Sequence, residues 1–340
     1  MAMRIETTMR ALADPTRLRI MRLLGTMELA VGELAQVLGQ SQPRVSQHVA
    51  KLCDSGLAER RREGSWVFLR MGTGAQPGGG RAGPVGDAVA RLLAIAEQED
   101  ADFHRQCEDD RRRLAAIRAA RVESAEAYFA AHAEEWDELR QLHSPDRLVE
   151  QRLADAMEGR PLGRLLDIGT GTGRMAELFA PQADHIVALD KSLEMLRIAR
   201  AKLQHLPAHG VELVQGDFAD LPFAAHEFDT VLLHQVLHFA QDPAAALAEA
   251  ARVTRPGGRI AIVDFAAHEF EELRARHEHA RLGFTDAGLA ALLKDAGYDP
   301  APPTALEGAE LVVKIWTGTR RPLPGESRDE QDQVKKEASR

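Results

Sequence analysis

The sequence predicts a multidomain chain: a small N-terminal domain of helices closed by a β-hairpin, a helical linker, and a C-terminal α/β domain. Three observations support this prediction. The 340 residues exceed one average domain. Residues 4–70 carry short helical patterns that end in an alternating run. From 164 to 320, apolar strand-like runs alternate with helical ones, which is typical of a parallel α/β sheet.

Composition argues against a membrane protein and against a secreted disulfide scaffold. No stretch of about 18 apolar residues occurs, so we expect no transmembrane helix and no membrane partner. The charged N-terminus lacks the apolar core of a signal peptide. Cys53 and Cys107 lie far apart and are too few for a disulfide framework, which fits a reducing cytoplasm.

Charge is unevenly distributed along the chain. The whole chain carries −9, yet residues 1–70 hold 11 Lys and Arg against 7 Asp and Glu, so that end carries +4 and the rest −13. A modestly basic end on an acidic protein is compatible with one DNA-contacting module attached to a domain that avoids DNA.

The N-terminal domain is predicted over residues 1–71. Two helices, about 31–38 and 42–52, are separated by a short break, and Ser41 is a good N-cap for the second helix. The alternating run 57–71 predicts a β-hairpin. Helix, turn, helix and hairpin is the plan of a winged helix-turn-helix, in which the second helix enters the major groove of DNA.

This plan supplies candidates for DNA contacts. Polar side chains at the start of the second helix can face base edges, and arginines of the hairpin can neutralise phosphates or reach the minor groove. The candidates are Gln42, Arg44, Ser46, Gln47 and Lys51 on the helix, with Arg60, Arg61 and Arg62 in the hairpin. The alternative is a helix-turn-helix used only for protein contacts.

From about residue 4 to 71, the chain resembles the ArsR/SmtB family of repressors, through LADPTRLRIMRLL and ELAVGELAQVLGQSQPRVSQHVAKLCDSGLAERRREGSWVFLRM. The resemblance implies a homodimer on double-stranded operator DNA, built with the first helix and the helix after the hairpin. A Gly/Pro-rich linker over 72–86 and one long dimerisation helix over 87–121 would fill the connecting segment 72–123.

The metal sites of that family are missing. Where arsenic-sensing members place a Cys-x-Cys, this chain has Ala30 and Gly32, which offer a soft metal no thiolate. Asp102 with His104 only faintly matches the second metal site of the family. We therefore expect no metal, and we expect Cys107 to be a packed residue rather than a sensor thiol.

The strongest chemical pattern is LLDIGTGTG, residues 165–173. An apolar strand leads into a Gly-x-Gly-x-Gly turn before a helix, and glycines let the backbone approach a ligand closely. The spacing departs from the Gly-x-Gly-x-x-Gly of dinucleotide-binding proteins. Taken alone, the turn leaves NAD, another ligand, or an ordinary turn without ligand open.

Two later strand ends sharpen the prediction. Asp190 ends the second strand, where a carboxylate can accept from both ribose hydroxyls. Asp217 follows the third, where it could accept from an adenine amine beside Phe218. These features resemble class I S-adenosylmethionine (SAM)-dependent methyltransferases over about 124–320. The resemblance implies a Rossmann-like, seven-stranded sheet with an antiparallel last strand. The tail 321–340 is predicted to be disordered.

The resemblance also implies the ligand, SAM or its product S-adenosylhomocysteine (SAH). The implied binding residues are Asp167, Gly169, Thr170, Gly171, Gly173, Asp190, Lys191, Asp217, Phe218, His234 and Tyr128. His234 would line the substrate side, although an ordinary strand-end histidine is equally compatible. Tyr128 and Trp136 lie in a segment that resembles the helix that covers the pocket in such enzymes. Alternatively, both side chains belong to the core.

Catalysis is less defined by the sequence. Methyl transfer is chiefly in-line positioning, sometimes helped by a general base, and the candidates for that base are His234, His238 and Asp264. The Asn/Asp-Pro-Pro-Tyr/Phe motif of adenine and amide N-methyltransferases does not follow the fourth strand. Enzymes that methylate arsenic need several cysteines, and both cysteines of this chain precede the methyltransferase-like region. We therefore expect no arsenic methylation. His277 and His279 are expected on a solvated helix face.

Two functions follow from the combination. The first is a DNA-binding transcription regulator, a homodimeric repressor whose methyltransferase-like domain senses SAM or SAH, as in the SAH-responsive repressors of the methionine cycle that the chain resembles. The second is a working methyltransferase on a small-molecule acceptor, with a DNA-binding domain that regulates its own operon. A protein or RNA acceptor completes the alternatives.

Overall fold

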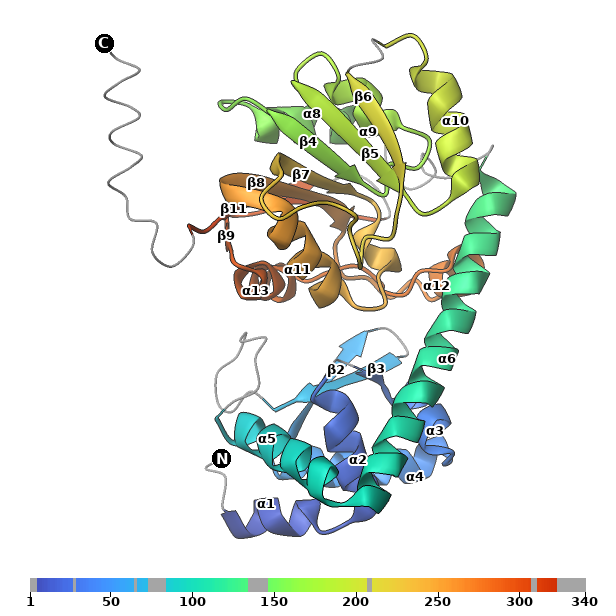
Figure 1. The fold of residues 1–340 in the computed structure, drawn as a ribbon, viewed down its shortest axis with the longest axis vertical. Coiled ribbons are helices and arrows are strands. Elements are labelled where there is room, and N and C mark those ends of the chain that lie inside the picture. The colour runs from blue at the N-terminus through green and yellow to red at the C-terminus, as the bar shows by residue number, and fades with distance from the viewer. Residues whose placement is uncertain are drawn as a thin grey trace.

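The computed structural model describes residues 5–26, 29–63, 66–72, 84–133, 146–206, 210–306 and 311–322. A helical domain with a small sheet and a larger α/β domain lie at opposite ends of one long helix, α6 (Ala101–His132), as Figure 1 shows. No helix in the described ranges is both long and apolar enough to cross a membrane.

The N-terminal domain is a winged helix-turn-helix, as predicted. Its elements are α1 (Ile5–Leu12), α2 (Pro15–Leu24), β1 (Leu29–Ala30), α3 (Val31–Leu38), α4 (Gln42–Asp54), β2 (Ala58–Glu63) and β3 (Trp66–Met71). Gly39 ends α3 in the left-handed region with φ 64°. Ser41 is extended, and Pro43 occupies the first turn of α4, where its missing N–H costs nothing.

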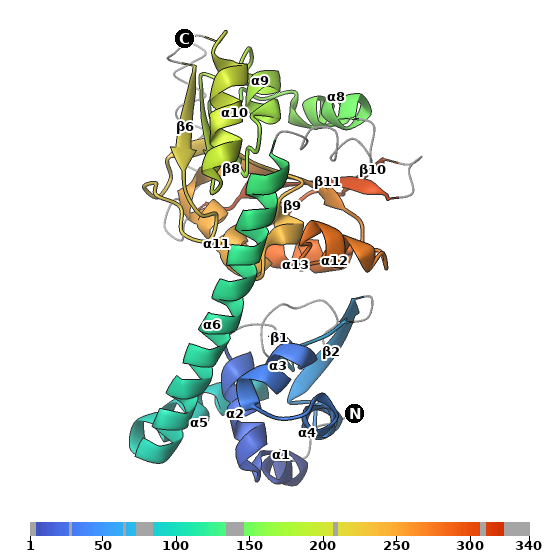
Figure 2. The same ribbon diagram turned by 90° about the vertical axis from the view of Figure 1, so that its right-hand side faces the viewer.

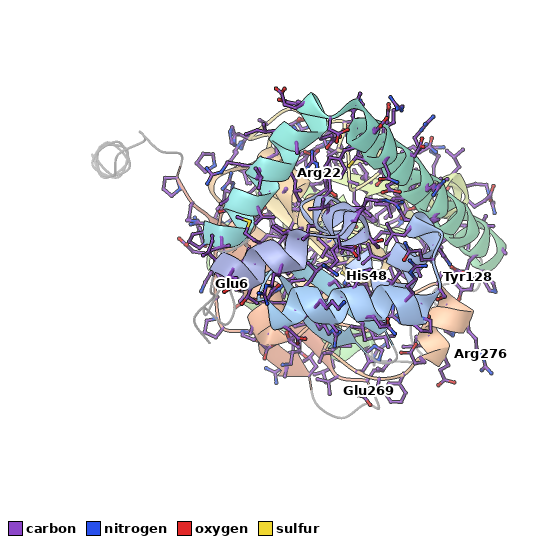
Figure 3. All side chains as sticks on the ribbon, turned by 90° about the horizontal axis from the view of Figure 1, so that it is seen from below. Glu6, Arg22, His48, Tyr128, Glu269 and Arg276 are labelled. Atoms are coloured by element: carbon purple, nitrogen blue, oxygen red, sulfur yellow. The ribbon has the colours of Figure 1, made fainter. Side chains whose placement is uncertain are left out.

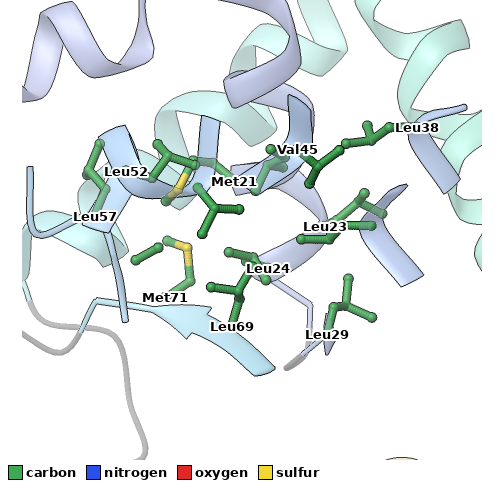
Figure 4. Close-up of a cluster of buried hydrophobic side chains, with 14 of the residues drawn as sticks. Met21, Leu23, Leu24, Leu29, Leu38, Val45, Leu52, Leu57, Leu69 and Met71 are labelled. Atoms are coloured by element: carbon green, nitrogen blue, oxygen red, sulfur yellow. The ribbon is translucent and has the colours of Figure 1, made fainter. Parts of the chain in front are cut away.

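One hydrophobic core holds this domain together. Met21 and Leu24 of α2 lie with Leu52 of α4 and Leu69 of β3 in the cluster of Figure 4. The short strand β1, which the sequence pattern did not predict, pairs with β3 and places β3 at the centre of a three-stranded sheet in the order β1-β3-β2.

The prediction of one helix over 87–121 is wrong. The segment holds two helices, α5 (Pro84–Glu99) and α6, and α5 begins inside the predicted linker. Asp100 separates them, since its side chain accepts the backbone N–H groups of Asp102 and Phe103 and thereby caps α6. Helix α6 continues to His132 and therefore carries Tyr128, while Trp136 lies outside the described residues.

The C-terminal domain is built on one mixed sheet. Its strands are β4 (Arg164–Ile168), β5 (His185–Asp190), β6 (Val211–Gln215), β7 (Phe228–His234), β8 (Thr254–Phe265), β9 (Tyr298–Pro300), β10 (Thr304–Leu306) and β11 (Val313–Arg320). The order is β10-β11-β8-β7-β4-β5-β6, with β9 also paired to β11. The pairs from β6 through β8 are parallel, and β11 is antiparallel to β8, as predicted.

Among the residues that the structure describes, the sheet has eight strands rather than the predicted seven. β9 and β10 both pair antiparallel with β11, at its two ends, so two short segments occupy the place of one strand. Pro302 and Pro303 lie between them. Proline lacks the N–H that a continuous ladder needs, which explains the interruption.

Helices cover both faces of this sheet. They are α8 (Asp146–Met157), α9 (Arg174–Phe179), α10 (Leu193–Leu203), the 3-10 helix η1 (Leu237–Phe239), α11 (Pro243–Val253), α12 (Glu272–His277) and α13 (Asp286–Ala296). Two separate apolar clusters result. In Figures 1 and 2, the β2–β3 hairpin lies on the side of the N-terminal domain that faces the α/β domain.

Candidate functional site

A cavity of about 460 Å³ opens at the carboxyl ends of β4, β5 and β7. This is the edge at which ligands bind in open α/β sheets. The cavity falls within the roughly 300–1,000 Å³ that small-molecule sites occupy. Its wall includes the loop after β4, the end of β5, the segment after β6 and the turn after β7.

The glycine loop after β4 is held against its neighbours at two points. Gly169 has φ +69°, and a Cβ there would come within 2.3 Å of the Val236 side chain, so no larger residue fits. The Gly171 N–H donates to Asp190 Oδ2 at 2.8 Å. The Thr170 hydroxyl donates to Asp167 Oδ2 at 2.6 Å, which fixes the carboxylate of a buried residue at the cavity edge.

Asp190 joins the loop to the next helix. Its second oxygen accepts the Ser192 N–H at 2.8 Å. Burial raises the pKa of Asp190, and these backbone hydrogen bonds partly oppose that rise by favouring the ionised form. Each carboxylate oxygen has further acceptor capacity, so Asp190 can hold the loop and accept hydroxyl groups from a ligand at the same time.

Lys191 and Asp217 form an ion pair across the mouth of the cavity. Lys191 Nζ lies 3.0 Å from Asp217 Oδ2, and both side chains are partly exposed. The other Asp217 oxygen accepts the Ala219 N–H at 2.9 Å. An incoming adenine amine would therefore share Asp217 with Lys191.

Most of the predicted binding residues meet in this cavity. Those that line it are Asp167, Gly169, Thr170, Gly171, Asp190, Lys191, Asp217, Phe218 and His234. Gly173 does not line it; it caps α9 with φ 87° beside Leu203. Tyr128 does not line it either, because its hydroxyl is hydrogen-bonded to His277 Nδ1 at 2.6 Å, and the next residue, Phe129, turns into the cavity instead.

The residues present fit a SAM-like nucleoside. The Gly169 position leaves no room for a side chain, so the backbone itself forms that wall. Acidic side chains line the ends of three consecutive strands, at Asp167, Asp190 and Asp217. Hydroxyl and amine groups of a nucleoside are donors, for which carboxylates are suitable acceptors.

Two histidines differ from their predicted roles. His238 does not line the cavity; it is buried behind it with Nδ1 2.8 Å from Asp264 Oδ1. His279 is not on a solvated helix face. Glu278 adopts a left-handed conformation with φ 56° and ends α12, which turns His279 into the cavity wall against His238, with ring centroids 4.2 Å apart.

Sequence reasoning missed several cavity residues. Gln235, directly after β7, lines the cavity with φ 52°, an uncommon conformation for a residue other than glycine. Such backbone strain is concentrated at functional sites, but no sequence pattern marks it. Phe239 and His279 come from η1 and the α12 turn, whose positions relative to the sheet are set only by folding.

The DNA-reading candidates on α4 lie on the outer face of the N-terminal domain, whereas the β2–β3 hairpin, which carries Arg60, lies on the side that faces the α/β domain. On α4, the side chains of Gln42, Arg44, Gln47 and Lys51 are exposed and Ser46 is half-buried. Figure 3 views this domain from its outer end, with His48 of α4 near the middle of the face. Arg60 is exposed on β2; the side chains of Arg61 and Arg62 lie outside the described residues.

Both domains match families of known proteins. Residues 14–60 match the family described as bacterial regulatory proteins of the arsR family, and residues 166–262 match the methyltransferase domain family.

Individual relatives span different parts of the chain. An uncharacterized 37.1 kDa protein in transposon TN4556 of Streptomyces fradiae is 34% identical over 225 residues, 58% of this chain and 64% of that protein. The demethylmenaquinone methyltransferase of Renibacterium salmoninarum is 32% identical over 164 residues, 48% of this chain and 64% of the enzyme. Uncharacterized protein MJ1123 of Methanocaldococcus jannaschii is 34% identical over 197 residues, 55% of this chain and 89% of that protein. The chain thus spans less than two thirds of the first two relatives.

Proposed function

The chain belongs to one family with MJ1123 and joins an arsR-family DNA-binding domain to a methyltransferase domain; from this premise we propose that it is a homodimeric transcription regulator whose effector is SAM or SAH. One observation carries the proposal: helix α4, whose exposed polar side chains could read DNA, and a cavity lined by a glycine loop and three carboxylates occur in the same chain. Ala30 and Gly32 offer a metal effector no thiolate at the family position.

Different cavity residues hold different parts of the ligand. Asp190 accepts the ribose hydroxyls, while Asp217 and Phe218 hold the adenine. Asp167 and the glycine loop hold the methionine part. When bound, SAM supplies an electrophilic methyl group and SAH is the form left after transfer. Regulation requires that DNA affinity differ between the ligand-bound and ligand-free states, which is a coupling free energy between two sites.

An exposed apolar surface supports the homodimer. The large apolar side chains exposed on α1 and α5 are Ile5, Met9, Val85, Leu92 and Ile95. Ile5 and Met9 are four residues apart and share one face of α1, and Leu92 and Ile95 share one face of α5. These two helices are the ones that the ArsR/SmtB resemblance assigns to the dimer contact, so we propose that they pair with a second copy.

A second candidate function is methyl transfer to a small, flat acceptor. Beyond the nucleoside residues, the cavity wall includes a group of aromatic side chains: Phe129, Phe239 and His279 line it, with the centroids of the Phe129 and Phe239 rings 4.8 Å apart. Several relatives are named demethylmenaquinone methyltransferase. His234 lies in the wall where it can take a proton, whereas His238 is held behind the wall by Asp264.

The decisive experiment measures operator affinity with no ligand, with SAM and with SAH, using a DNA site selected in vitro and fluorescence anisotropy. Calorimetry gives the affinity for each ligand. We expect at least one ligand to change operator affinity by about fivefold or more, the lower end of typical allosteric coupling. If neither ligand changes it, the sensor proposal fails, and turnover of SAM with candidate acceptors would then favour the enzyme.

The DNA face has its own test. Arg44→Ala removes an exposed side chain able to read guanine and should cost about 1–3 kcal/mol of operator binding. Its SAH affinity should equal that of the unaltered protein. Operator binding that survives Arg44→Ala unchanged would show that α4 reads DNA through other residues.

A further inference from the structure

The cavity wall is not made by the methyltransferase domain alone. Two of its lining residues, Glu33 of α3 and Phe68 of β3, belong to the DNA-binding domain. Both side chains are buried in the full chain. The same cavity therefore contacts the ends of β4 and β5 on one side and the helix-turn-helix sheet on the other.

Arg281 connects the two sides. Its guanidinium carbon lies 4.2 Å from the centroid of the Phe68 ring, and Arg274 lies 6.0 Å from it. Arg281 itself is 3% exposed, and cation–π contacts are stronger when they are removed from water. Its guanidinium donates to the Gln241 carbonyl at 3.2 Å, and its backbone N–H donates to the His238 carbonyl at 2.9 Å. Arg281 is thus fixed to the methyltransferase domain.

Phe68 is fixed to the hairpin. It lies on β3, the central strand of the small sheet, and pairs in register with Arg61 of β2. A displacement of Phe68 moves the backbone that carries the hairpin arginines. Glu33 makes a second connection, since its carboxylate accepts the Ala30 N–H at 2.8 Å at the start of α3, the helix that precedes α4 with its candidate DNA contacts.

Helix α6 is a further connection between the two domains. At its N-terminal half, Asp110 receives two hydrogen bonds from the Arg19 guanidinium and is buried against α2. At its C-terminal end, Phe129 lines the cavity. The two domains are therefore joined by one continuous helix (Figures 1 and 2), and they also meet at the contact between Phe68 and Arg281.

We propose that the ligand site is shared between the domains, with Phe68 and Glu33 as part of its wall, and that the Phe68–Arg281 contact transmits occupancy of the cavity to the hairpin. The transmission rests on the proposed function, in which SAM or SAH changes DNA binding. The shared wall does not, because it requires only that ligand binding depend on a residue of the DNA-binding domain.

The test uses the full chain and SAH as the probe, with Phe68→Ala and Arg281→Gln as variants. Operator affinity is measured with and without SAH, and SAH affinity with and without operator, because coupling is reciprocal and both ratios must agree. We expect both ratios to fall to within about twofold of one in each variant. A variant that is only destabilised would bind operator and SAH more weakly, but SAH would still change operator affinity, and operator would still change SAH affinity, by the same factor as in the unaltered protein.

Arg164→Gln is the matched control. Its guanidinium lies 5.4 Å from the Phe228 ring, at the amino ends of the strands and away from the cavity. It should keep both ratios of the unaltered protein. If Phe68→Ala does not fold, Phe68→Leu removes the ring while keeping an apolar side chain, and the same loss is expected. The proposed transmission through Phe68 and Arg281 would be overturned if their variants kept both ratios of the unaltered protein, or if Arg164→Gln lost them.

The two proposals fail in different ways. If SAH does not alter operator affinity in the unaltered chain, the sensor function fails and the transmission with it. The shared wall is then decided by SAH affinity alone, which Phe68→Ala should weaken by about threefold or more because part of the apolar wall is lost. An SAH affinity that is the same in Phe68→Ala, Phe68→Leu and the unaltered protein would overturn the shared wall.

Discussion

Asp190 illustrates what a single residue contributes to the site. Its two oxygens accept backbone N–H groups from Gly171 and Ser192, so it fixes the glycine loop and the start of α10 together. It also lines the cavity. The loop geometry and the ligand contact therefore depend on the same carboxylate, and removing it should affect both.

Asp190→Ala should weaken SAH binding by about 10- to 100-fold, the equivalent of losing one hydrogen bond to a charged group at about 1.5–3 kcal/mol. Titration calorimetry measures this loss. Asp295→Ala, at an exposed position on α13, is the control and should bind SAH normally. Normal binding by Asp190→Ala would exclude Asp190 from the ribose site.

The thiol of Cys107 should be unreactive in the folded protein. Burial raises the pKa of Cys107 to about 11, so little thiolate exists at neutral pH. We expect native Cys107 to react with a disulfide reagent about 100-fold or more slowly than in the unfolded chain, since an exposed thiol has a pKa near 8.5. Mass spectrometry of timed samples separates it from the half-buried Cys53. Equal rates in folded and unfolded protein would contradict the packing of α6.

Glu97 should make the fold less stable at acidic pH. Hydrogen bonds from Arg111, and then Arg22, hold the pKa of Glu97 below its ordinary value. Because the pKa is lowered, ionised Glu97 stabilises the fold at pH values above about 4.3, the pKa of a glutamate in the unfolded chain. This stabilisation is lost as the pH falls toward the pKa of Glu97 in the folded protein. Urea unfolding followed between pH 6 and pH 3 should therefore show a smaller decline in Glu97→Gln than in the unaltered protein. Parallel declines would assign the acid sensitivity to other carboxylates.

At the scale of elements, the segment between the domains differs most from expectation. The Ala, Leu, Arg and Glu of 87–121 favour helix throughout, and neither proline nor glycine interrupts them. The break depends on Asp100, whose side chain accepts two backbone N–H groups. Aspartate is compatible with both a helix interior and an N-cap, so only the packing of α5 and α6 against α2 decides between them.

The apolar faces of α1 and α5 should carry the dimer. Leu92→Asp places a charge on the exposed face of α5 and should shift the protein from dimer to monomer, because burying an unpaired carboxylate costs several kcal/mol. Sedimentation velocity measures the change. Leu148→Asp alters a similarly exposed leucine on α8 of the other domain and should leave the assembly unchanged. A Leu92→Asp dimer would exclude this face.

At the scale of the whole molecule, the described residues form three apolar clusters, one in the DNA-binding domain and two on the faces of the large sheet. Separate cores unfold as separate units unless contacts between them are strong. Helix α6 and the Phe68–Arg281 contact connect the DNA-binding domain to the α/β domain. Ligand binding at a site that both domains touch should therefore stabilise both domains against unfolding.

Differential scanning calorimetry can test this at the level of the full chain. SAH at about 100 times its Kd should stabilise the methyltransferase transition by about 2.7 kcal/mol. The DNA-binding transition should also move upward, and in Phe68→Ala it should stay where it is without ligand. A DNA-binding transition that ignores SAH in the unaltered protein would show that the domains respond separately.

Local patterns in the sequence determined much of this protein. Alternation of strands and helices predicted the α/β sheet, and turn and cap residues predicted the helix-turn-helix. Because parallel strands end at one edge of the sheet, the strand pattern was sufficient to place residues 167, 190 and 217 together. These inferences succeed because each depends on hydrogen bonds or side-chain periodicity within a short segment.

Only the tertiary structure decided the rest. The placement of Phe129 rather than Tyr128 in the cavity depends on the rotation of α6, and the burial of His279 depends on the left-handed turn at Glu278. Phe68 reaches the cavity from a strand almost 100 residues before the glycine loop. No periodicity connects such positions; they meet because two domains pack at a distance and angle set by one shared helix.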